Sequence, residues 1–449
     1  MTLPPDPLKA SGIADFVRRL RRGEVTARDT AAAYLSRIAA LDETLGALTY
    51  NASEQAVAAA GAVDELLGAG TDLGPLMGVP VLIKDLYTVA GMPTTAGSRV
   101  DIADLVQPEG YLVTTLKRAG CVVLGKTVTT EFALGMFNLT HRSPRNPRDM
   151  DVPRMTGGSS SGSAVAMAAG LAAFTLGSDT GGSVRAPAAL CGVFGFKASP
   201  GLWPADGIFP LAPTLDSPGF FSASAEDAAI IFGVLSGQPT PAARPVRGLR
   251  LGRPTNHFFS ELDSAVAAAI EGACAALEKA GAQIIPFEIG EAAEIDTVFA
   301  RMVPAELIAT LGKDRFVRSE GIIDPVAWQR AVGGLDLSAV EYDTLLRRYH
   351  ALCAIAAERV GAFDAWLSPT VPTVAPPMAD FTTVDRVAAW NQRATHNTRP
   401  INLFSQCAVS LPLPGPGLPV GLQIAGAKGR DARVLSIALG VERALRGAG

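Results

Sequence analysis

The sequence predicts an α/β fold: a single α/β/α sandwich in which helices flank a central, twisted, mixed β-sheet. Three observations predict it. Helical patterns occupy roughly the first 70 of the 449 residues, short apolar runs alternate with amphipathic stretches from residue 78 onward, and the chain shows no internal repeat. Alternating strand and helix signals are typical of a sheet whose faces are covered by helices.

Three helices are expected first. Residues 12–45 predict two amphipathic helices, the second opening at Thr26, where Asp29 three positions later makes a near capping box. Residues 53–67 predict a third, Ala-rich helix. After these come apolar runs of strand length. The strand candidates are residues 79–83, 121–124, 172–176, 249–252, 283–286, 365–368 and 421–424.

The domain organisation follows from one linker-like stretch. Residues 237–246 are rich in Pro and small residues, and we expect them to connect two lobes of one sheet. We therefore predict a single domain, residues 1–449. In it a helical segment, 1–70, packs on a core of residues 71–235, and residues 247–449 complete the sheet and the substrate pocket.

The amino-acid composition limits the classes of partner that the protein is expected to bind. A net charge of −4 and a pI near 5.7 give no basic field for nucleic acid or an anionic membrane. Charged residues make up 18%, below the usual ~25%, which is consistent with a large core or an extensive contact between protomers and leaves a homodimer open. We expect a small molecule as the substrate.

The compartment is predicted to be the cytoplasm. The five cysteines are scattered and lack a C-x-x-C pair, as expected of small core residues in a reducing compartment. Residues 1–7 have neither the basic start nor the apolar segment of a signal peptide. The longest apolar tract, residues 164–176, is too short and too interrupted by glycine to cross a bilayer.

Residues 157–185 are the most informative stretch, because two Gly-Gly-Ser turns bracket an Ala-rich apolar segment. Such turns place the hydroxyls of Ser159 and Ser183 on tight, exposed backbone. Serine is a candidate nucleophile only if a base lies within hydrogen-bond reach. The four histidines lie outside comparable glycine-framed segments. Lys84, at the end of the apolar run 78–83, is the better base, because burial lowers a lysine pKa and frees the amine to accept a proton.

Each of these residues also has a simpler interpretation. Lys84 alone would be a surface lysine with a buried stem, and the Gly-Ser turns alone would be helix N-caps. Only their joint spacing favours a catalytic set.

The sequence also matches two other functional motifs, but the secondary structure expected around each match is wrong for that motif. Residues 120–127 fit the phosphate-binding loop expression with Lys126 as its lysine. Their variable positions are apolar and predict the strand itself, whereas a phosphate loop follows a strand. Residues 158–162 fit the nucleophile elbow G-x-S-x-G centred on Ser160. That motif requires a preceding strand, and residues 143–153 are too rich in proline and charge to form one.

The chain resembles the amidase signature hydrolases, serine enzymes with a Ser-cisSer-Lys triad. The resemblance is carried by G-V-P-V-L-I-K-D from residue 78, G-K-T-x-x-x-E-F from 125, G-G-S-S-S-G-S from 157, D-T-G-G-S-V-R-A-P from 179, L-D-S-P-G from 215, S-P-T-V-P from 368 and L-P-V-G-L-Q-I-A-G from 418. It implies that Ser183 is the acylated nucleophile, Ser159 the bridging serine and Lys84 the base. The separation of 24 positions between the serines matches the family pattern and favours Ser159 over Ser160 and Ser161.

The resemblance also implies supporting groups. Asp179 and Arg185 flank the nucleophile and are expected to hold its loop without touching substrate. The expected oxyanion hole consists of the backbone N–H groups of Thr180, Gly181, Gly182 and Ser183. No metal or organic cofactor is expected, because the sequence has no ligand spacing for one.

The implied function is hydrolysis of a carbon–nitrogen amide bond through a serine acyl-enzyme. Val128, Thr130 and Ser161 depart from the residues common in the family, exchanging an amide, a carboxylate and a glycine. We expect a more apolar pocket, shaped by residues 299–384, that takes aryl or alkyl amides, with carbamate esters open to the same triad. Candidate lining aromatics are Trp203, Phe209, Phe220, Phe221 and Trp328. The alternative is the amidase-type subunit of a tRNA-dependent glutamine amidotransferase, which the altered polar positions disfavour.

Overall fold

The computed structural model describes residues 6–8 and 11–447. Across these residues runs one eleven-stranded sheet with the strand order β1-β3-β2-β4-β6-β5-β10-β11-β9-β7-β8. Its strands are β1 (Leu48–Asn51), β2 (Pro80–Lys84), β3 (Val122–Thr127), β4 (Phe174–Ser178), β5 (Phe194–Lys197), β6 (Pro218–Ser222), β7 (Arg250–Pro254), β8 (Gln283–Phe287), β9 (Ala365–Pro369), β10 (Cys407–Pro412) and β11 (Gly421–Gly426).

The sheet is mixed. Strand β2 runs parallel to both of its neighbours, β3 and β4, and β7 runs parallel to β8 and β9. The remaining pairings, from β4 through β6, β5, β10 and β11 to β9 and between β1 and β3, are antiparallel. Because the carboxyl ends of parallel neighbours meet at one edge of a sheet, the last residues of β2 and β4 lie close together.

Helices flank this sheet. They are α1 (Gly12–Arg21), α2 (Ala27–Leu45), α3 (Ser53–Gly68), α4 (Tyr111–Arg118), α5 (Ser161–Ala168), α6 (Arg185–Cys191), α7 (Ala225–Ser236), α8 (Ser264–Lys279), α9 (Phe299–Leu311), α10 (Lys313–Arg318), α11 (Pro325–Ala331), α12 (Ala339–Val360), α13 (Val384–Ala394), α14 (Arg399–Leu403) and α15 (Asp431–Arg446). Short 3₁₀ turns are η1 (Ala103–Leu105), η2 (Glu131–Ala133), η3 (Gly290–Asp296), η4 (Val332–Asp336) and η5 (Met378–Asp380).

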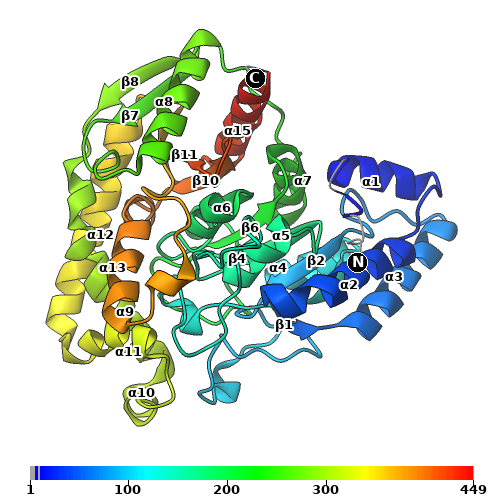
Figure 1. Ribbon diagram of the computed structural model, residues 1–449, viewed down its shortest axis with the longest axis horizontal. Helices are drawn as coiled ribbons and strands as arrows, with labels where there is room; N and C mark the ends of the chain where they lie inside the picture. The colour runs from blue at the N-terminus through cyan, green and yellow to red at the C-terminus, as the bar shows by residue number, and fades with distance from the viewer. Residues whose placement is uncertain (1–5, 9–10, 448–449) are drawn as a thin grey trace.

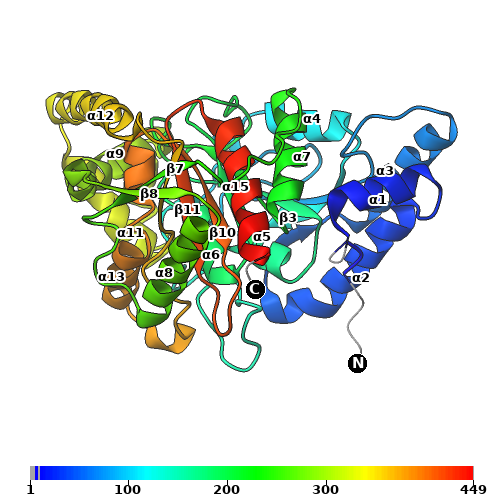
Figure 2. The same cartoon turned by 90° about the horizontal axis from the view of Figure 1, so that it is seen from above.

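The helices divide along the length of the sheet. Figures 1 and 2 both place α1, α2 and α3 at one end of the molecule and α9, α11, α12 and α13 at the opposite end, and Figure 1 shows β1 at the same end as α1, α2 and α3. Helices α5 and α6 contact each other and the central strands, as do α7 and α15. The arrangement confirms the predicted α/β fold with helices around a mixed sheet.

Local sequence explains where the N-terminal helices begin and end. The Thr26 side chain accepts a hydrogen bond from the Asp29 N–H at 2.9 Å, which caps α2 as predicted. That helix ends at Gly46, which adopts the left-handed conformation with φ of 67°. The third predicted helix is confirmed as α3.

All seven predicted strands are present, with ends shifted by at most three residues. Strands β1, β5, β6 and β10 were not predicted. Strand β1 is an edge strand with two exposed residues among its four, and β5 and β6 each contain a glycine, so these three strands lack a clean strand pattern. The linker residues 237–246 lead from α7 to β7.

No helix of the described residues combines the length and the apolar character needed to span a bilayer. The sequence expectation about residues 1–7 falls largely on residues 1–5, which lie outside the described residues.

Candidate active site

Lys84 is the last residue of β2, a strand whose five residues are all buried between β3 and β4. Its Nζ lies 2.7 Å from Ser159 Oγ and 2.9 Å from Ser178 Oγ. Burial lowers the pKa of Lys84 to about 7, against the opposing effect of the negative charges on Asp216 and Asp179. A large share of the lysine is therefore neutral near pH 7 and can accept a proton.

Ser159 follows a cis peptide bond, Gly158–Ser159. Its carbonyl oxygen accepts the Thr130 N–H at 3.1 Å, which ties this turn to the segment after β3. Gly158 lies against Met136, where a Cβ atom would come within 2.8 Å of a backbone oxygen. Glycine is therefore required here by close packing.

Ser160 and Ser161 do not compete with Ser159 for Lys84. The Ser160 hydroxyl donates to the Ser178 carbonyl oxygen at 3.2 Å, and its N–H donates to the Ser183 carbonyl oxygen at 3.2 Å. Ser161 begins α5. The structure thus joins the turns of Ser159 and Ser183 through Ser160, and the N-cap positions of α5 and α6 are Ser160 and Val184 rather than the two predicted catalytic serines.

Ser183 lies on the turn between β4 and α6 and is 8% exposed. It lines a small cavity of about 30 Å³ together with Thr180 and Gly181. The Gly182 N–H donates to Asp179 Oδ1 at 2.8 Å, so this group supports the loop, and its predicted role in the oxyanion hole is corrected. Within the described part of the chain, the N–H groups of Thr180, Gly181 and Ser183 have no acceptor and stay available for an oxyanion.

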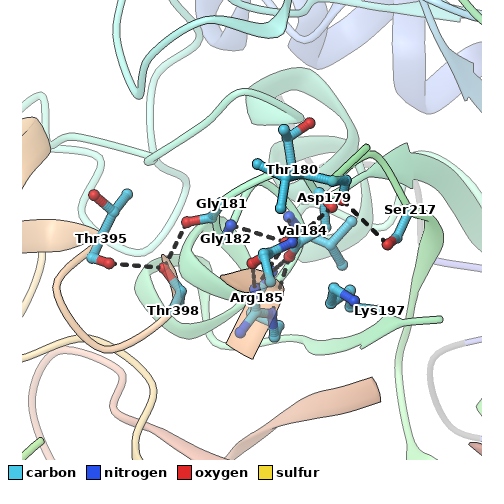
Figure 3. Close-up of polar contacts among 12 residues, drawn as sticks. Asp179, Thr180, Gly181, Gly182, Val184, Arg185, Lys197, Ser217, Thr395 and Thr398 are labelled. Carbon is cyan, nitrogen blue, oxygen red and sulfur yellow. Dashed lines mark hydrogen bonds and ion pairs between the residues drawn. The ribbon is translucent and has the colours of Figure 1, made fainter. Parts of the chain in front are cut away.

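Asp179 and Arg185 form a fully buried ion pair beneath this loop (Figure 3). Arg185 donates to both carboxylate oxygens, at 2.8 and 3.0 Å, and Asp179 also accepts the Val184 N–H. Burial alone would raise the pKa of Asp179, but the charge and hydrogen bonds of Arg185 hold it well below its usual range. The pair is placed where the sequence predicted a loop support.

Thr398 holds the other side of the loop. Its hydroxyl donates to the Gly181 carbonyl oxygen at 2.8 Å and lies 3.2 Å from the Thr395 carbonyl oxygen, as Figure 3 shows. A Cβ atom on Gly182 would lie 2.0 Å from Thr398 Oγ1. The glycine lets the segment before α14 approach the loop that carries Ser183 closely.

The sequence matches a known protein family over most of its length. The amidase family model matches residues 29–435. The chain belongs to the amidase family. It is therefore a hydrolase of amide carbon–nitrogen bonds.

Three similar proteins illustrate the range of the family. The 2-amino-5-chloromuconic acid deaminase of Comamonas testosteroni is 41% identical, covering 96% of this chain and 95% of the relative. A glutamyl-tRNA(Gln) amidotransferase subunit of Halorhodospira halophila (strain DSM 244 / SL1) is 33% identical, covering 95% of each chain. A crystal structure of an amidase superposes with a TM-score of 0.88 at 30% identity, covering 97% of this chain and 100% of that chain.

Two polar groups near Lys84, a hydroxyl and a carboxylate, were missed by the sequence analysis. Ser178 ends β4 beside Lys84, and Asp216 accepts hydrogen bonds from the Thr180 hydroxyl and from the N–H groups of Leu211 and Ala212. Asp216 lies in the L-D-S-P-G motif that was part of the family resemblance, so the signal was present without a role attached.

The residues that line the site are mostly not those that the sequence analysis singled out. Val128 lines a separate cavity with His141 and Asp85, and Thr130 hydrogen bonds to the Gly135 carbonyl oxygen, so these exchanges do not make the Ser183 cavity more apolar. Of the five candidate aromatics, Phe209 lines a neighbouring cavity of about 100 Å³ that shares Ala133, Thr180 and Leu211 with the one at Ser183. The other four pack in the interior or, like Trp328, against another ring.

Lys126 is part of β3, and its Nζ pairs with Asp85 at 2.8 Å and donates to the Pro93 carbonyl oxygen at the same distance. Residues 120–127 therefore form a strand and the approach to it, as the sequence predicted. The phosphate-loop interpretation is excluded by this geometry, because the backbone N–H groups that would cradle a phosphate belong to the sheet.

Proposed function

We propose that the chain hydrolyses an aryl or alkyl amide through an acyl-enzyme on Ser183, with Ser159 as the bridging hydroxyl and Lys84 as the base. The observation that carries the proposal is the 2.7 Å contact between Lys84 Nζ and Ser159 Oγ, made by a lysine whose pKa burial lowers to about 7. A buried amine at that pKa is suited to general base catalysis near neutral pH.

The proposed proton path starts at the contact between Lys84 and Ser159 and continues to Ser183 by analogy with the triad of the family that the sequence resembles. Neutral Lys84 takes the proton of Ser159 while Ser159 takes the proton of Ser183, whose oxygen attacks the substrate carbonyl carbon. The N–H groups of Thr180, Gly181 and Ser183 stabilise the oxyanion, each contributing roughly 3 to 4 kcal/mol by comparison with other oxyanion holes. The relay then returns the proton to the leaving nitrogen, the carbon–nitrogen bond breaks, and water hydrolyses the ester on Ser183.

Ser178 completes the lysine environment. Its hydroxyl lies 2.9 Å from Lys84 Nζ, and its N–H donates to Ser160 Oγ at 3.3 Å. We propose that Ser178 positions the amine toward Ser159, because two neighbouring hydroxyls fix the direction of the Nζ lone pair and protons.

The substrate class is supported by the cavity beside the loop. Its lining includes Leu86, Phe209, Pro210 and Pro213, an apolar surface that fits an aryl or alkyl group. The relative named for deamination of 2-amino-5-chloromuconic acid supports carbon–nitrogen cleavage in a small organic molecule. A carbamate ester presents a similar carbonyl to the same nucleophile and is kept within the proposal.

The test is a panel of anilides, alkyl amides, ureas and carbamates given to the purified chain, combined with labelling by a neutral sulfonyl fluoride. We expect turnover of at least one amide and a single adduct located on Ser183 by mass spectrometry. An adduct on Ser160, or turnover retained in Ser183→Ala, would overturn the assignment.

A second candidate is the amidase-type subunit of a tRNA-dependent glutamine amidotransferase, which is favoured by relatives of that kind at 33% identity over almost the whole chain. This candidate predicts ammonia release from glutamine and a partner protein that co-purifies. Hydrolysis of anilides by the isolated chain without glutamine hydrolysis would exclude it.

A further inference from the structure

Two arginines line the Ser183 cavity and point to a requirement on the substrate. Arg330 belongs to α11, and Arg399 is the first residue of α14. Both lie in the wall of the cavity that contains Ser183, and both continue into an adjoining, more open cavity of about 500 Å³. Within residues 11–447, neither guanidinium has a hydrogen-bond or ion-pair partner.

Arg399 lies directly against the loop that carries Gly181 and Ser183. Its guanidinium stacks on the Phe299 ring, 5.4 Å from the ring centroid. A Cβ atom on Gly181 would come within 2.5 Å of Phe299 Cζ and 3.4 Å of Arg399 Cγ. The arginine stem and the ring thus pack on one of the proposed oxyanion donors, and the charged end is held in place by the stacking.

The positive charges of Arg330 and Arg399 are not fully neutralised by carboxylates among the described residues. Burial, together with the neighbouring charge of Arg330, lowers the pKa of Arg399 to about 9, and burial lowers that of Arg330 to about 10, so both are cationic at neutral pH. Asp296 lines the outer cavity and raises the pKa of Arg399, but the two form no ion pair among the described residues. Setting the carboxylate of Asp296 against the two arginines leaves one positive charge without an opposite charge in a partly desolvated wall, where a bound anion would stabilise it.

We propose that Arg330 and Arg399 bind a carboxylate of the substrate, so that the amide that is hydrolysed belongs to a molecule bearing a second, free carboxylate. This inference rests on the proposed function, because it takes Ser183 as the reacting group. Guanidinium groups bind carboxylates through paired, charge-assisted hydrogen bonds. A singly charged carboxylate matches the single unbalanced charge, whereas a phosphate dianion would exceed it.

The carboxylate can lie on the acyl side or on the amine side of the amide, and matched substrates separate these cases. The acyl-side pair is glutaryl 4-nitroanilide and pentanoyl 4-nitroanilide, and the amine-side pair is N-butanoyl-4-aminobenzoate and butyranilide. We expect one anionic member to exceed its neutral partner in kcat/KM. Equal values in both pairs would overturn the proposal.

Variants of the two arginines test whether these side chains cause the preference for the anionic substrate. Arg330→Met and Arg399→Met should each lower kcat/KM for the preferred anionic substrate about 10- to 100-fold, mainly through KM, and should lower kcat/KM for the neutral partner much less. Arg399→Lys should recover part of the loss because it keeps the charge. The control is Arg386→Met, an exposed arginine of α13 outside both cavities. Equal losses on both members of a pair would indicate a structural role and overturn the proposal.

A labelling experiment keeps this inference separate from the proposed function. Glutarate should slow the labelling of Ser183 by a neutral sulfonyl fluoride in the wild type and in Arg386→Met, and should not slow it in the two arginine-to-methionine variants. If glutarate leaves labelling unchanged in the wild type, the carboxylate site is wrong although the serine assignment stands. If Ser183 is not labelled and none of the four anilides is hydrolysed, the proposed function itself fails.

Discussion

Asp216 influences Lys84 through charge alone. Its carboxylate is engaged by the Thr180 hydroxyl and by the N–H groups of Leu211 and Ala212, whereas Lys84 Nζ contacts Ser159 and Ser178. Burial raises the pKa of Asp216, and the three donors oppose that shift because they stabilise the ionised form. The negative charge in turn raises the pKa of Lys84 and partly offsets the effect of burial.

We therefore expect Asp216→Asn to lower the pKa of Lys84. The acid limb of kcat/KM should move to lower pH, because the neutral amine then persists at higher proton concentrations. Asparagine keeps one oxygen for the two backbone N–H groups, and its amide can donate to Thr180, so the loop is expected to keep its shape. The check is a pH profile beside that of Asp314→Asn, an exposed carboxylate of α10. If the acid limb of the kcat/KM profile stays at the same pH, the charge of Asp216 does not affect the pKa of Lys84.

The wild-type pH profile follows from the same lysine. Lys84 accepts a proton only when it is neutral, and its pKa is about 7. Below this pH, kcat/KM should fall about tenfold for each unit, and above it the rate should approach a plateau. A rate that stays constant down to about pH 5 would be incompatible with Lys84 as the base.

The proposed relay predicts an order among three variants. Ser183→Ala should reduce turnover to background because the acyl-enzyme cannot form. Lys84→Ala should nearly do so, and Ser159→Ala should cost about 10²- to 10⁴-fold in kcat, the usual contribution of proton transfer. The matched control is Ser161→Ala, which removes a neighbouring hydroxyl on α5. Wild-type rates in Ser159→Ala would rule out the bridging role, and thermal melts would show whether each variant is folded.

Much of the central site could be predicted from sequence because its signals are local. The apolar run before Lys84 predicts a buried strand end, and the glycines around Ser159 and Ser183 predict tight turns. Ser178 could not be found in this way. It meets Lys84 only because β2 and β4 are parallel neighbours, so that the residues ending both strands share one edge of the sheet.

The cavity wall was harder to predict for the same reason. Arg330 and Arg399 are separated by 69 positions in the sequence, and only the folded chain brings both into the wall of the cavity that contains Ser183. The expectation of an apolar wall rested on Val128 and Thr130, which are near the catalytic motifs in sequence but face other parts of the interior. Val128 and Thr130 therefore do not line the Ser183 cavity, although they are close to these motifs in the sequence.

The ion pair of Asp179 and Arg185 yields a prediction about stability. Arg185→Met would leave the Asp179 carboxylate buried without its counter-charge, and breaking a buried pair in this way typically costs about 3 to 5 kcal/mol of unfolding free energy. The double variant Asp179→Asn with Arg185→Met should recover part of that loss, because it removes the unpaired charge.

Urea denaturation measures both effects, and the rate of Ser183 labelling reports whether the loop is intact. The control is Arg347→Met, which removes one partner of an exposed pair with Asp343 on α12 and should leave the denaturation midpoint unchanged. We expect Arg185→Met to slow labelling as well, because Asp179 holds the Gly182 N–H and thereby the turn that carries Ser183. A denaturation midpoint and a labelling rate equal to those of the control would show that the pair does not support the loop.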